Sequence, residues 1–509
     1  MQNFLKSIWQ DASTAPSFHS LTSDLQTDVV VVGAGITGIT TAYLLAKQGV
    51  KVVVLESDKL GSGCTAFSTG HLTSSLDADY SFVSSAIDKE TARKVAFSMQ
   101  NAINFIEQVC KDENIACDFV RLSAYQYTED ESSVQDVNDG GKATIEAGLN
   151  AFFTNTIPLP FSVKRAFELK DQGEFNALKY IYGLAQCIVR DGGQIFEKTH
   201  VTDVDDSEPC VVTTKNGQKI TAKHVVLATH TPIQFNITQA EMIPYRSYVV
   251  AAKVEKDKVA KGLYWDVLKH YHYIRTYEMN GENYLIIGGE DHKVGESGYD
   301  ENESFRRLEF YAKAKFGITE FSHRWSSQHF EAADGLPYIG RSPFGKNKYI
   351  ATGFTGDGLT FGVVSALLLS DLLTGKDNPL AKVYAPNRAN IVASAKDWVE
   401  ENLTTMYHFV KDRLTTDASE AAEVPRGEGC IVRVEGKQLA VYRDDNDVVH
   451  ALSPVCTHMH CIVQWNDSDK SWDCPCHGAR FEASTGEVLN GPAVRALTKE
   501  TISPETKKV

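Results

Sequence analysis

The feature that most constrains the fold is a buried strand that runs directly into a glycine-rich turn near the start of the chain. Residues 27–32 read TDVVVV, and Gly33, Gly35 and Gly38 follow in a G-x-G-x-x-G pattern. Residues 39–48 then form a predicted helix that a glycine ends. A strand, a glycine turn and a helix in this order are typical of a Rossmann-type α/β sheet that binds a dinucleotide.

The residues of this unit have separate physical roles. Gly33 permits the tight turn, Gly35 lets the backbone approach a pyrophosphate, and Gly38 lets the helix pack closely on the strand. The unpaired N–H groups at the helix N-terminus favour phosphate. A second predicted strand, residues 51–55, ends at Glu56, which lies 18 residues beyond Gly38 and can accept hydrogen bonds from ribose hydroxyls.

A second glycine-rich segment lies much later in the chain. Residues 349–362 read YIATGFTGDGLTFG, which predicts a strand, a turn with Gly353, Gly356 and Gly358, and the start of an apolar helix. The N–H groups of such a turn can face a flavin ring or its ribityl chain. The sequence has no second G-x-G-x-x-G, so it predicts no separate nicotinamide domain.

With these motifs, and with VVLATH at 225–230 and ADGLPYIG at 333–340, residues 28–373 resemble the D-amino-acid-oxidase and glycine-oxidase family of flavoproteins. The resemblance implies FAD as cofactor, and oxidation next to an amine nitrogen by hydride transfer to the flavin. It also implies a Rossmann-type FAD-binding half interleaved with an antiparallel-sheet substrate half. The expected flavoprotein domain is 1–414, with FAD-binding segments at about 27–80, 190–235 and 331–390, and substrate segments at about 81–189 and 236–330.

The substrate residues are less constrained. Tyr248, Tyr273 and Arg275 lie in aromatic strand patterns and are candidates for the roof of a substrate cavity, although sheet packing explains the same aromatics. Amino-acid oxidases of the family hold the substrate carboxylate with arginines, and those positions fall here on His329 and Gly356. The sequence therefore favours an amine or an N-substituted amino compound, with Tyr248, Arg275 and His329 as candidate catalytic residues.

Two further residues, His71 and Cys64, are candidates for covalent attachment of FAD, but an ordinary structural role also explains them. Some flavoproteins of this kind tether FAD through a histidine near the first motif, and His71 and Cys64 lie in the polar loop that follows it. A single histidine in such a loop usually does no more than form hydrogen bonds, and scattered cysteines are usually inert. The sequence leaves covalent attachment open.

The last 90 residues contain the densest chemical signal. Cys456 and His458 form a C-x-H pair, and Cys474 and His477 form a C-x2-H pair after 15 intervening residues. Two thiolates and two imidazoles on separate loops form a metal site, and zinc accepts the same ligand set. Short strands with turn signals surround the pairs, which predicts a small all-β domain.

The spacing CTH…CPCHG resembles Rieske [2Fe–2S] proteins over residues 423–503. The resemblance implies that Cys456 and Cys474 bind one iron and that His458 and His477 bind the other. It also implies a disulfide between Cys461 and Cys476 that joins the two ligand loops. The expected boundaries are a linker at 415–425 and a Rieske domain at 426–509.

Rieske proteins of high potential usually carry serine directly after CPCHG and tyrosine two residues later. Ala479 and Phe481 occupy these positions here. Both hydroxyls would hydrogen-bond to cluster sulfur, so their loss predicts a lower potential.

Other functions of a Rieske domain fit the sequence less well. Ring-hydroxylating oxygenases need an H-x4-H iron site, and no two of the 15 histidines lie five apart. The chain also shows no membrane anchor of the cytochrome bc kind. A flavin enzyme joined to a one-electron carrier is the prediction that remains, with a ferredoxin-like protein as external acceptor or donor. Electron flow from the cluster to FAD, and a non-enzymatic redox sensor, remain alternatives.

The composition of the chain disfavours a nucleic-acid partner, a membrane span and a secretory signal. The chain has 66 acidic against 51 basic residues, a net charge of −15, which disfavours nucleic acid as a partner. No run of residues reaches the roughly 18 apolar residues of a membrane span. The first 16 residues lack the apolar core of a secretory signal, so a cytoplasmic protein is expected.

Overall fold

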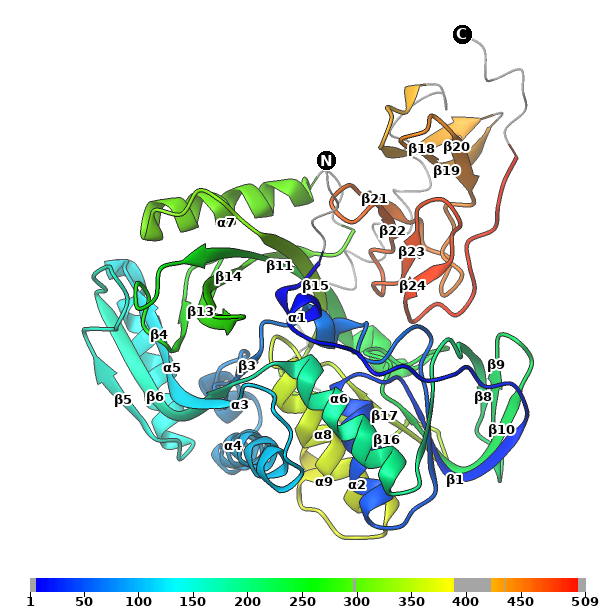
Figure 1. Cartoon of the computed structure of the whole chain (residues 1–509), viewed down its shortest axis with the longest axis horizontal. Coiled ribbons are helices and arrows are strands. Elements are labelled where there is room, and N and C mark those ends of the chain that lie inside the picture. Colours follow the sequence, from blue (N-terminus) through cyan, green and yellow to red (C-terminus); the bar gives the residue numbers. More distant parts are fainter. Residues whose placement is uncertain (1–5, 296–298, 389–422, 435, 502–509) are drawn as a thin grey trace.

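The computed structural model describes residues 6–295, 299–388, 423–434 and 436–501 (Figure 1). Two large sheets with their covering helices make up an N-terminal part, residues 6–388. Two small sheets make up a C-terminal part, residues 423–501. This arrangement confirms the predicted fold class of an α/β nucleotide-binding half, a second sheet and a small all-β domain. Residues 415–422 of the predicted linker lie outside the described residues.

The first sheet contains the glycine turn. Its strands run in the order β16 (Tyr338–Arg341), β17 (Lys348–Thr352), β10 (Lys219–Leu227), β1 (Leu25–Val32), β2 (Val52–Leu55) and β7 (Gln194–Phe196). All neighbours are parallel except β16 and β17. A side hairpin, β8 (Val201–Asp205) and β9 (Cys210–Thr214), extends from β10.

Apolar side chains cover both faces of this sheet, which explains the unbroken valine run of β1. Val29 and Val31 join one hydrophobic core, whereas Val30 and Val32 join another on the opposite face. A strand that is buried on both sides needs no polar alternation. The first core contains the helices α2 (Ile36–Lys47), α4 (Lys89–Asp112), α6 (Ala177–Arg190) and α8 (Gly358–Leu373), with the short α1 (Ile8–Asp11), α3 (Tyr80–Ala86) and α9 (Leu380–Val383).

The second sheet forms the other half of the N-terminal part. Its order is β15 (His323–Ala332), β11 (Met242–Val254), β14 (Glu282–Lys293), β13 (His272–Met279), β12 (Leu263–Asp266), β4 (Val120–Thr128), β6 (Arg165–Glu174) and β3 (His71–Leu72), with β5 (Ala151–Thr154) beside β6. All pairs are antiparallel except β12 with β4, which is parallel. The helix α7 (Glu301–Phe316) packs against β11 and β14, and α5 (Val134–Glu146) packs against β5 and β6.

The C-terminal part consists of two small antiparallel sheets (Figure 1). One contains β18 (Gly429–Val434), β19 (Lys437–Arg443) and β20 (Val449–Leu452). The other contains β21 (Gln464–Asn466), β22 (Ser471–Asp473), β23 (Arg480–Glu482) and β24 (Val488–Asn490). Among the helices of the described residues, none is long and apolar enough to cross a bilayer.

The glycine turn gives a test of the fold. A Cβ atom added to Gly38 would lie 1.9 Å from the carbonyl oxygen of Gly33, and this backbone atom cannot move away cheaply. We expect Gly38→Ala to lower the free energy of unfolding by at least about 1–3 kcal/mol, the usual cost of overpacking. Thermal or denaturant unfolding measures the change.

The matched control is Gly49→Asn, just beyond the same helix. Gly49 has φ +78°, which asparagine tolerates, and no atom lies within 4 Å of its added Cβ. A Gly38→Ala protein as stable as Gly49→Asn would show that the turn is less tightly packed than the structure indicates.

Candidate functional site

The glycine turn presents backbone N–H groups at the entrance of a large cavity. Gly33 has φ +101°, and its added Cβ would lie 2.4 Å from the carbonyl oxygen of Ala228 on the neighbouring strand. Glu56 closes the turn, because its Oε2 atom accepts a hydrogen bond from the N–H of Ala34 at 2.8 Å. Gly33, Gly35 and Glu56 line the cavity, whereas Gly38 lies beneath it and lets α2 approach the turn.

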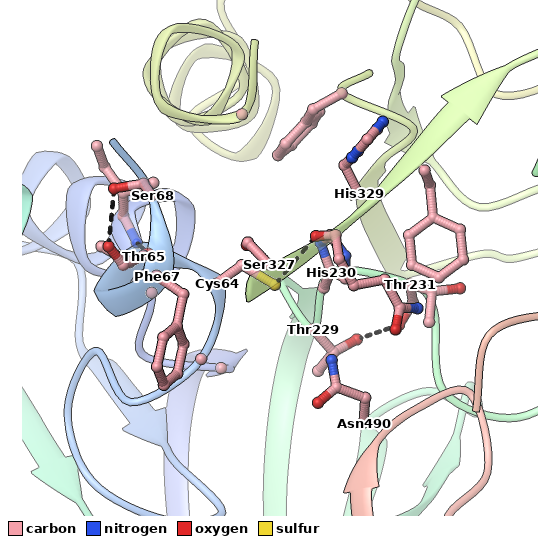
Figure 2. A pocket seen from close by; sticks show the side chains of 18 of the residues that line it. Cys64, Thr65, Phe67, Ser68, Thr229, His230, Thr231, Ser327, His329 and Asn490 are labelled. Atoms are coloured by element: carbon pink, nitrogen blue, oxygen red, sulfur yellow. Dashed lines mark hydrogen bonds between the residues drawn. The ribbon is translucent and has the colours of Figure 1, made fainter. Parts of the chain in front are cut away.

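The cavity has a volume of about 1430 Å³. It extends from the glycine turn along the second sheet to residues 487–491 and 493–496 of the C-terminal part. Drug-sized ligands occupy about 300–1,000 Å³, so this space fits a dinucleotide cofactor together with a substrate. Figure 2 shows side chains from distant segments in this pocket, including Cys64, Thr229, His329 and Asn490.

The second glycine-rich segment forms another wall of the cavity. Gly356 and Gly358 line it at the start of α8. A Cβ atom on Gly356 would lie 2.8 Å from Oδ2 of Asp77, so that carboxylate occupies the place of a side chain at this position. Gly353 does not belong to the lining. It has φ +73° and turns the backbone against the side chains of Met242 and Ala332.

Of the three candidate catalytic residues, only His329 lines the cavity. Its Nε2 atom lies 3.8 Å from Asp291 and 3.6 Å from Glu331. Burial alone would lower the pKa of His329, but Glu331 and Asp291 outweigh this effect and raise it to about 9. The imidazole therefore carries a positive charge at neutral pH.

Tyr248 and Arg275 do not lie at the cavity, which corrects the predicted roof. Successive side chains of a strand point to opposite faces, so Ser247 of β11 lines the cavity while Tyr248 packs on the other face against Phe305 of α7. Arg275 is 1% exposed and holds a loop in place through the carbonyl oxygen of Gly70 at 2.7 Å. Tyr273, by contrast, does line the cavity.

His71 and Cys64 both line the cavity. Burial, together with the charge of Arg275, lowers the pKa of His71 to about 3, so its ring is neutral. Its Nε2 atom has no hydrogen-bond partner among the described residues. Cys64 donates a weak hydrogen bond to the carbonyl oxygen of Gln328 at 3.6 Å (Figure 2).

Sequence reasoning missed several cavity residues. Tyr271 and Asp77 line the cavity, and Gln328 lines the side next to the C-terminal part. Asp291 contacts the lining residues His329 and Tyr271. The only sequence signal for Asp291 was a charged pair within an apolar strand. The others depend on contacts between distant segments.

The four candidate cluster ligands lie together on two loops of the C-terminal part. The Cys456 and Cys474 side chains pack in one buried core, and the rings of His458 and His477 have centroids 5.0 Å apart. Both ring nitrogens of His458 and the Nδ1 atom of His477 lack a hydrogen-bond partner among the described residues. Burial lowers the pKa of both histidines to about 4, so both are neutral, as metal ligands must be.

Cys461 and Cys476 form a disulfide that joins the two ligand loops. The predicted disulfide is therefore present. Because each partner is close in sequence to a candidate ligand, the bond fixes the two loops relative to each other.

The second ligand loop also contacts the N-terminal part. The Nε2 atom of Gln328 donates a hydrogen bond to the carbonyl oxygen of Gly478 at 3.0 Å. A Cβ atom on Gly478 would lie 2.4 Å from this Nε2 atom and 2.7 Å from Cβ of Pro244. Only glycine fits at this contact, so the loop lies directly against β15 and β11.

A buried ion network completes the junction of the two parts. The carboxylate of Asp469 pairs with Arg246 of β11 and with Arg480, the latter at 2.6 Å. Arg480 also pairs with Asp473 at 3.0 Å. The side chains of these four residues are 3–9% exposed. Burial and the charge of Arg480 lower the pKa of Arg246 to about 10, so it stays charged at neutral pH.

This network predicts a large effect for Asp469→Asn. Its amide would leave two buried guanidinium groups without their shared counter-charge, and breaking a buried pair costs about 3–5 kcal/mol. We expect the free energy of unfolding to fall by that order, and limited proteolysis between the two parts to accelerate.

Lys215→Gln is the matched control, because Lys215 pairs with Glu487 across the same junction at 2.7 Å but with both side chains more than half exposed. Its loss should cost less than about 1 kcal/mol. Equal effects of the two variants would contradict the importance of the buried network.

Comparisons with known proteins identify the family. Residues 28–372 match the family model of FAD dependent oxidoreductases named DAO, and residues 415–501 match the Rieske [2Fe-2S] domain. The chain belongs to this family of FAD-dependent oxidoreductases and carries a Rieske domain at its C-terminal side. It is therefore an oxidoreductase with FAD and a [2Fe–2S] cluster as cofactors, as the sequence predicted.

Individual relatives agree with this assignment. The iron-sulfur protein YhfW of Bacillus subtilis (strain 168), named for a Rieske 2Fe-2S centre, is 33% identical over 505 residues, which are 97% of this chain and 98% of that protein. Gamma-glutamylputrescine oxidoreductase of Escherichia coli (strain K12) is 26% identical over 70% of this chain and 86% of its own length. The crystal structure of glycine oxidase from Geobacillus kaustophilus has a TM-score of 0.60 at 18% identity, covering 71% of this chain and 99% of that one.

Proposed function

We propose that the protein oxidises a C–N bond of an amine or N-substituted amino compound in the large cavity and passes the electrons singly through its Rieske centre. FAD supplies a hydride acceptor, and the [2Fe–2S] cluster supplies a one-electron carrier. The observation that carries the proposal is the hydrogen bond from Gln328 to Gly478. Gln328 lines the flavin cavity, and Gly478 belongs to the loop of Cys474 and His477, so no other protein is needed between the two sites.

The proposed FAD-binding residues lie at two ends of the cavity. Gly33, Gly35 and Gly38, with Glu56, serve the nucleotide end, where the start of α2 offers unpaired N–H groups. Gly356 and Gly358 serve the other end at the start of α8, and Gly353 shapes the turn that leads to them. The size of the cavity supports this division.

For the cluster, we propose Cys456 and Cys474 as ligands of one iron and His458 and His477 as ligands of the other. Two buried thiols and two neutral imidazoles without other partners form the donor set that a Rieske centre needs. The disulfide between Cys461 and Cys476 supports the set by holding both loops.

His329 is the predicted catalytic residue that the proposal keeps. Because it is protonated and flanked by Asp291 and Glu331, its ring can orient a substrate but cannot accept a proton from it. Electrons leave the cluster to a one-electron acceptor such as a ferredoxin-like protein. Met459, next to the ligand His458, is 43% exposed and gives such a partner access to the cluster loop.

Cys456→Ser tests the order of the electron path. The variant should lose the cluster but keep FAD, because the two sets of residues lie in different parts of the chain. An amine substrate should still bleach the flavin under anaerobic conditions, while steady-state reduction of a one-electron acceptor should fall by at least about a hundredfold. Stopped-flow absorbance and acceptor assays measure the two steps separately.

Cys430→Ser is the control within the same domain, since Cys430 lies on β18 and is not a proposed ligand. It should retain both activities. Unchanged acceptor turnover in Cys456→Ser would place the cluster outside the electron path and favour a sensor role.

The cluster potential gives another prediction. Ala479 and Phe481 are 1% and 0% exposed in the core around the ligand cysteines. Hydroxyl groups at these positions would donate hydrogen bonds to cluster sulfur. A hydrogen bond to a charged group contributes about 1.5–3 kcal/mol, and we assign about 1 kcal/mol of this to the preference of each hydroxyl for the reduced cluster. Ala479→Ser with Phe481→Tyr should therefore raise the midpoint potential by roughly 50–100 mV.

The wild-type midpoint should lie in the lower half of the Rieske span of about −150 to +300 mV. Redox titration followed by electron paramagnetic resonance measures both proteins. A wild-type value near the top of the span, or a double variant that does not shift upward, would contradict the prediction.

A further inference from the structure

The wall of the cavity around His329 is strongly acidic. Asp77 and Asp357 line it, and Asp291 and Glu331 lie within 3.8 Å of the Nε2 atom of His329, whose ring carries a positive charge. Tyr271 donates a hydrogen bond to Oδ2 of Asp291 at 2.9 Å, while Oδ1 of Asp291 has no partner among the described residues. Phenol rings and carboxylates together form a lining typical of cation binding.

Asp77 and Asp357 are held side by side across two loops. Oδ2 of Asp357 accepts a hydrogen bond from the N–H of Asp77 at 2.9 Å, and Oδ2 of Asp77 accepts one from the N–H of Gly356 at 3.2 Å. Asp357 stands at the N-cap of α8, yet its side chain does not cap that helix. Burial and the neighbouring Asp77 raise the pKa of Asp357, because burial and a second carboxylate both disfavour its charged form.

A second observation points to a ligand at the same place. Thr355, directly before Gly356, is 7% exposed and lines the cavity, but its hydroxyl has no hydrogen-bond partner among the residues that the structure describes. Buried polar groups are normally paired, so a free hydroxyl at a cavity wall indicates a partner that binds there.

Four of the five arginine and lysine side chains that line the cavity are engaged elsewhere, and the fifth, Arg495, lies in the C-terminal part. Arg246 and Arg480 pair with Asp469 at the junction with the Rieske domain, and Lys198 and Lys215 pair with Asp58 and Glu487. None of these ion pairs involves the acidic wall. A carboxylate placed beside Asp77 would meet repulsion, whereas an ammonium group would relieve the repulsion between Asp77 and Asp357.

We propose that this wall binds a second cationic nitrogen of the substrate, so that diamines are preferred over monoamines and over amino acids. The inference rests on the proposed function, because one nitrogen of the substrate must be the one that is oxidised. The reacting amine is neutral, and the other nitrogen binds as an ammonium ion beside Asp77 and Asp357.

Three compounds of equal chain length test the proposal with the holoenzyme: 1,4-diaminobutane, butylamine and 4-aminobutanoate. They share the reacting CH2–NH2 group and differ only in the far end, which is an ammonium, a methyl or a carboxylate group. In anaerobic flavin reduction, the apparent Kd of the diamine should be at least about tenfold below that of butylamine, the usual contribution of a hydrogen-bonded charge. The carboxylate should bind weakest.

Asp77→Asn should remove the advantage of the diamine over butylamine, and Asp291→Asn tests the same effect from the sheet side. Asp139→Asn on α5, outside the cavity, is the control for loss of one acidic charge and should keep the wild-type ratio. A wild-type preference for 4-aminobutanoate, or a diamine advantage that survives both the Asp77 and the Asp291 substitution, would overturn the proposal.

A binding experiment separates this inference from the proposed function. The non-oxidisable 1,4-bis(trimethylammonio)butane and succinate can be compared by their perturbation of the oxidised flavin spectrum. Should no amine reduce the flavin, the proposed function fails, and this comparison still decides the charge preference. Tighter binding of the dication that depends on Asp77 supports the inference, and tighter binding of succinate overturns it.

Discussion

The arrangement of the two redox sites depends on the carboxylate of Asp469, which lies between two buried guanidinium groups. Arg246 comes from the sheet that forms the flavin cavity, and Arg480 is the first residue of β23, directly after the second ligand loop. Without this shared counter-charge Arg246 would lose its paired carboxylate and Arg480 would keep only Asp473, so the carboxylate of Asp469 holds the Rieske domain in position against this sheet. The contact from Gln328 to Gly478 then follows from that position.

The sequence was sufficient for the features that depend on local chemistry. Gly33 and Gly38 permit contacts that any Cβ atom would block, and such positions are visible as a spaced motif. The cysteine and histidine pairs of the Rieske domain are also local, since each loop supplies one thiol and one imidazole. The disulfide between Cys461 and Cys476 could be predicted only through resemblance, because spacing alone does not determine how cysteines pair.

The substrate wall could not be predicted in the same way. Tyr248 was placed at the cavity although its neighbour Ser247 lies there, because the face of a strand is set by register and not by residue type. Arg275 was a candidate for the roof of the cavity, but its side chain holds a buried loop through the carbonyl oxygen of Gly70. Asp77 and Gly356 are 279 positions apart in the sequence, so no sequence motif joins them.

The contact between Asp77 and Gly356 has a consequence for how such a site can evolve. Since the carboxylate lies 2.8 Å from the place of a Cβ atom at 356, any larger residue there would have to displace it. Changes at positions 77 and 356 are therefore coupled, and a side chain at 356 is accommodated most easily once the carboxylate at 77 is gone. The proposed preference for a cation over a carboxylate would then depend on the order in which the two positions change.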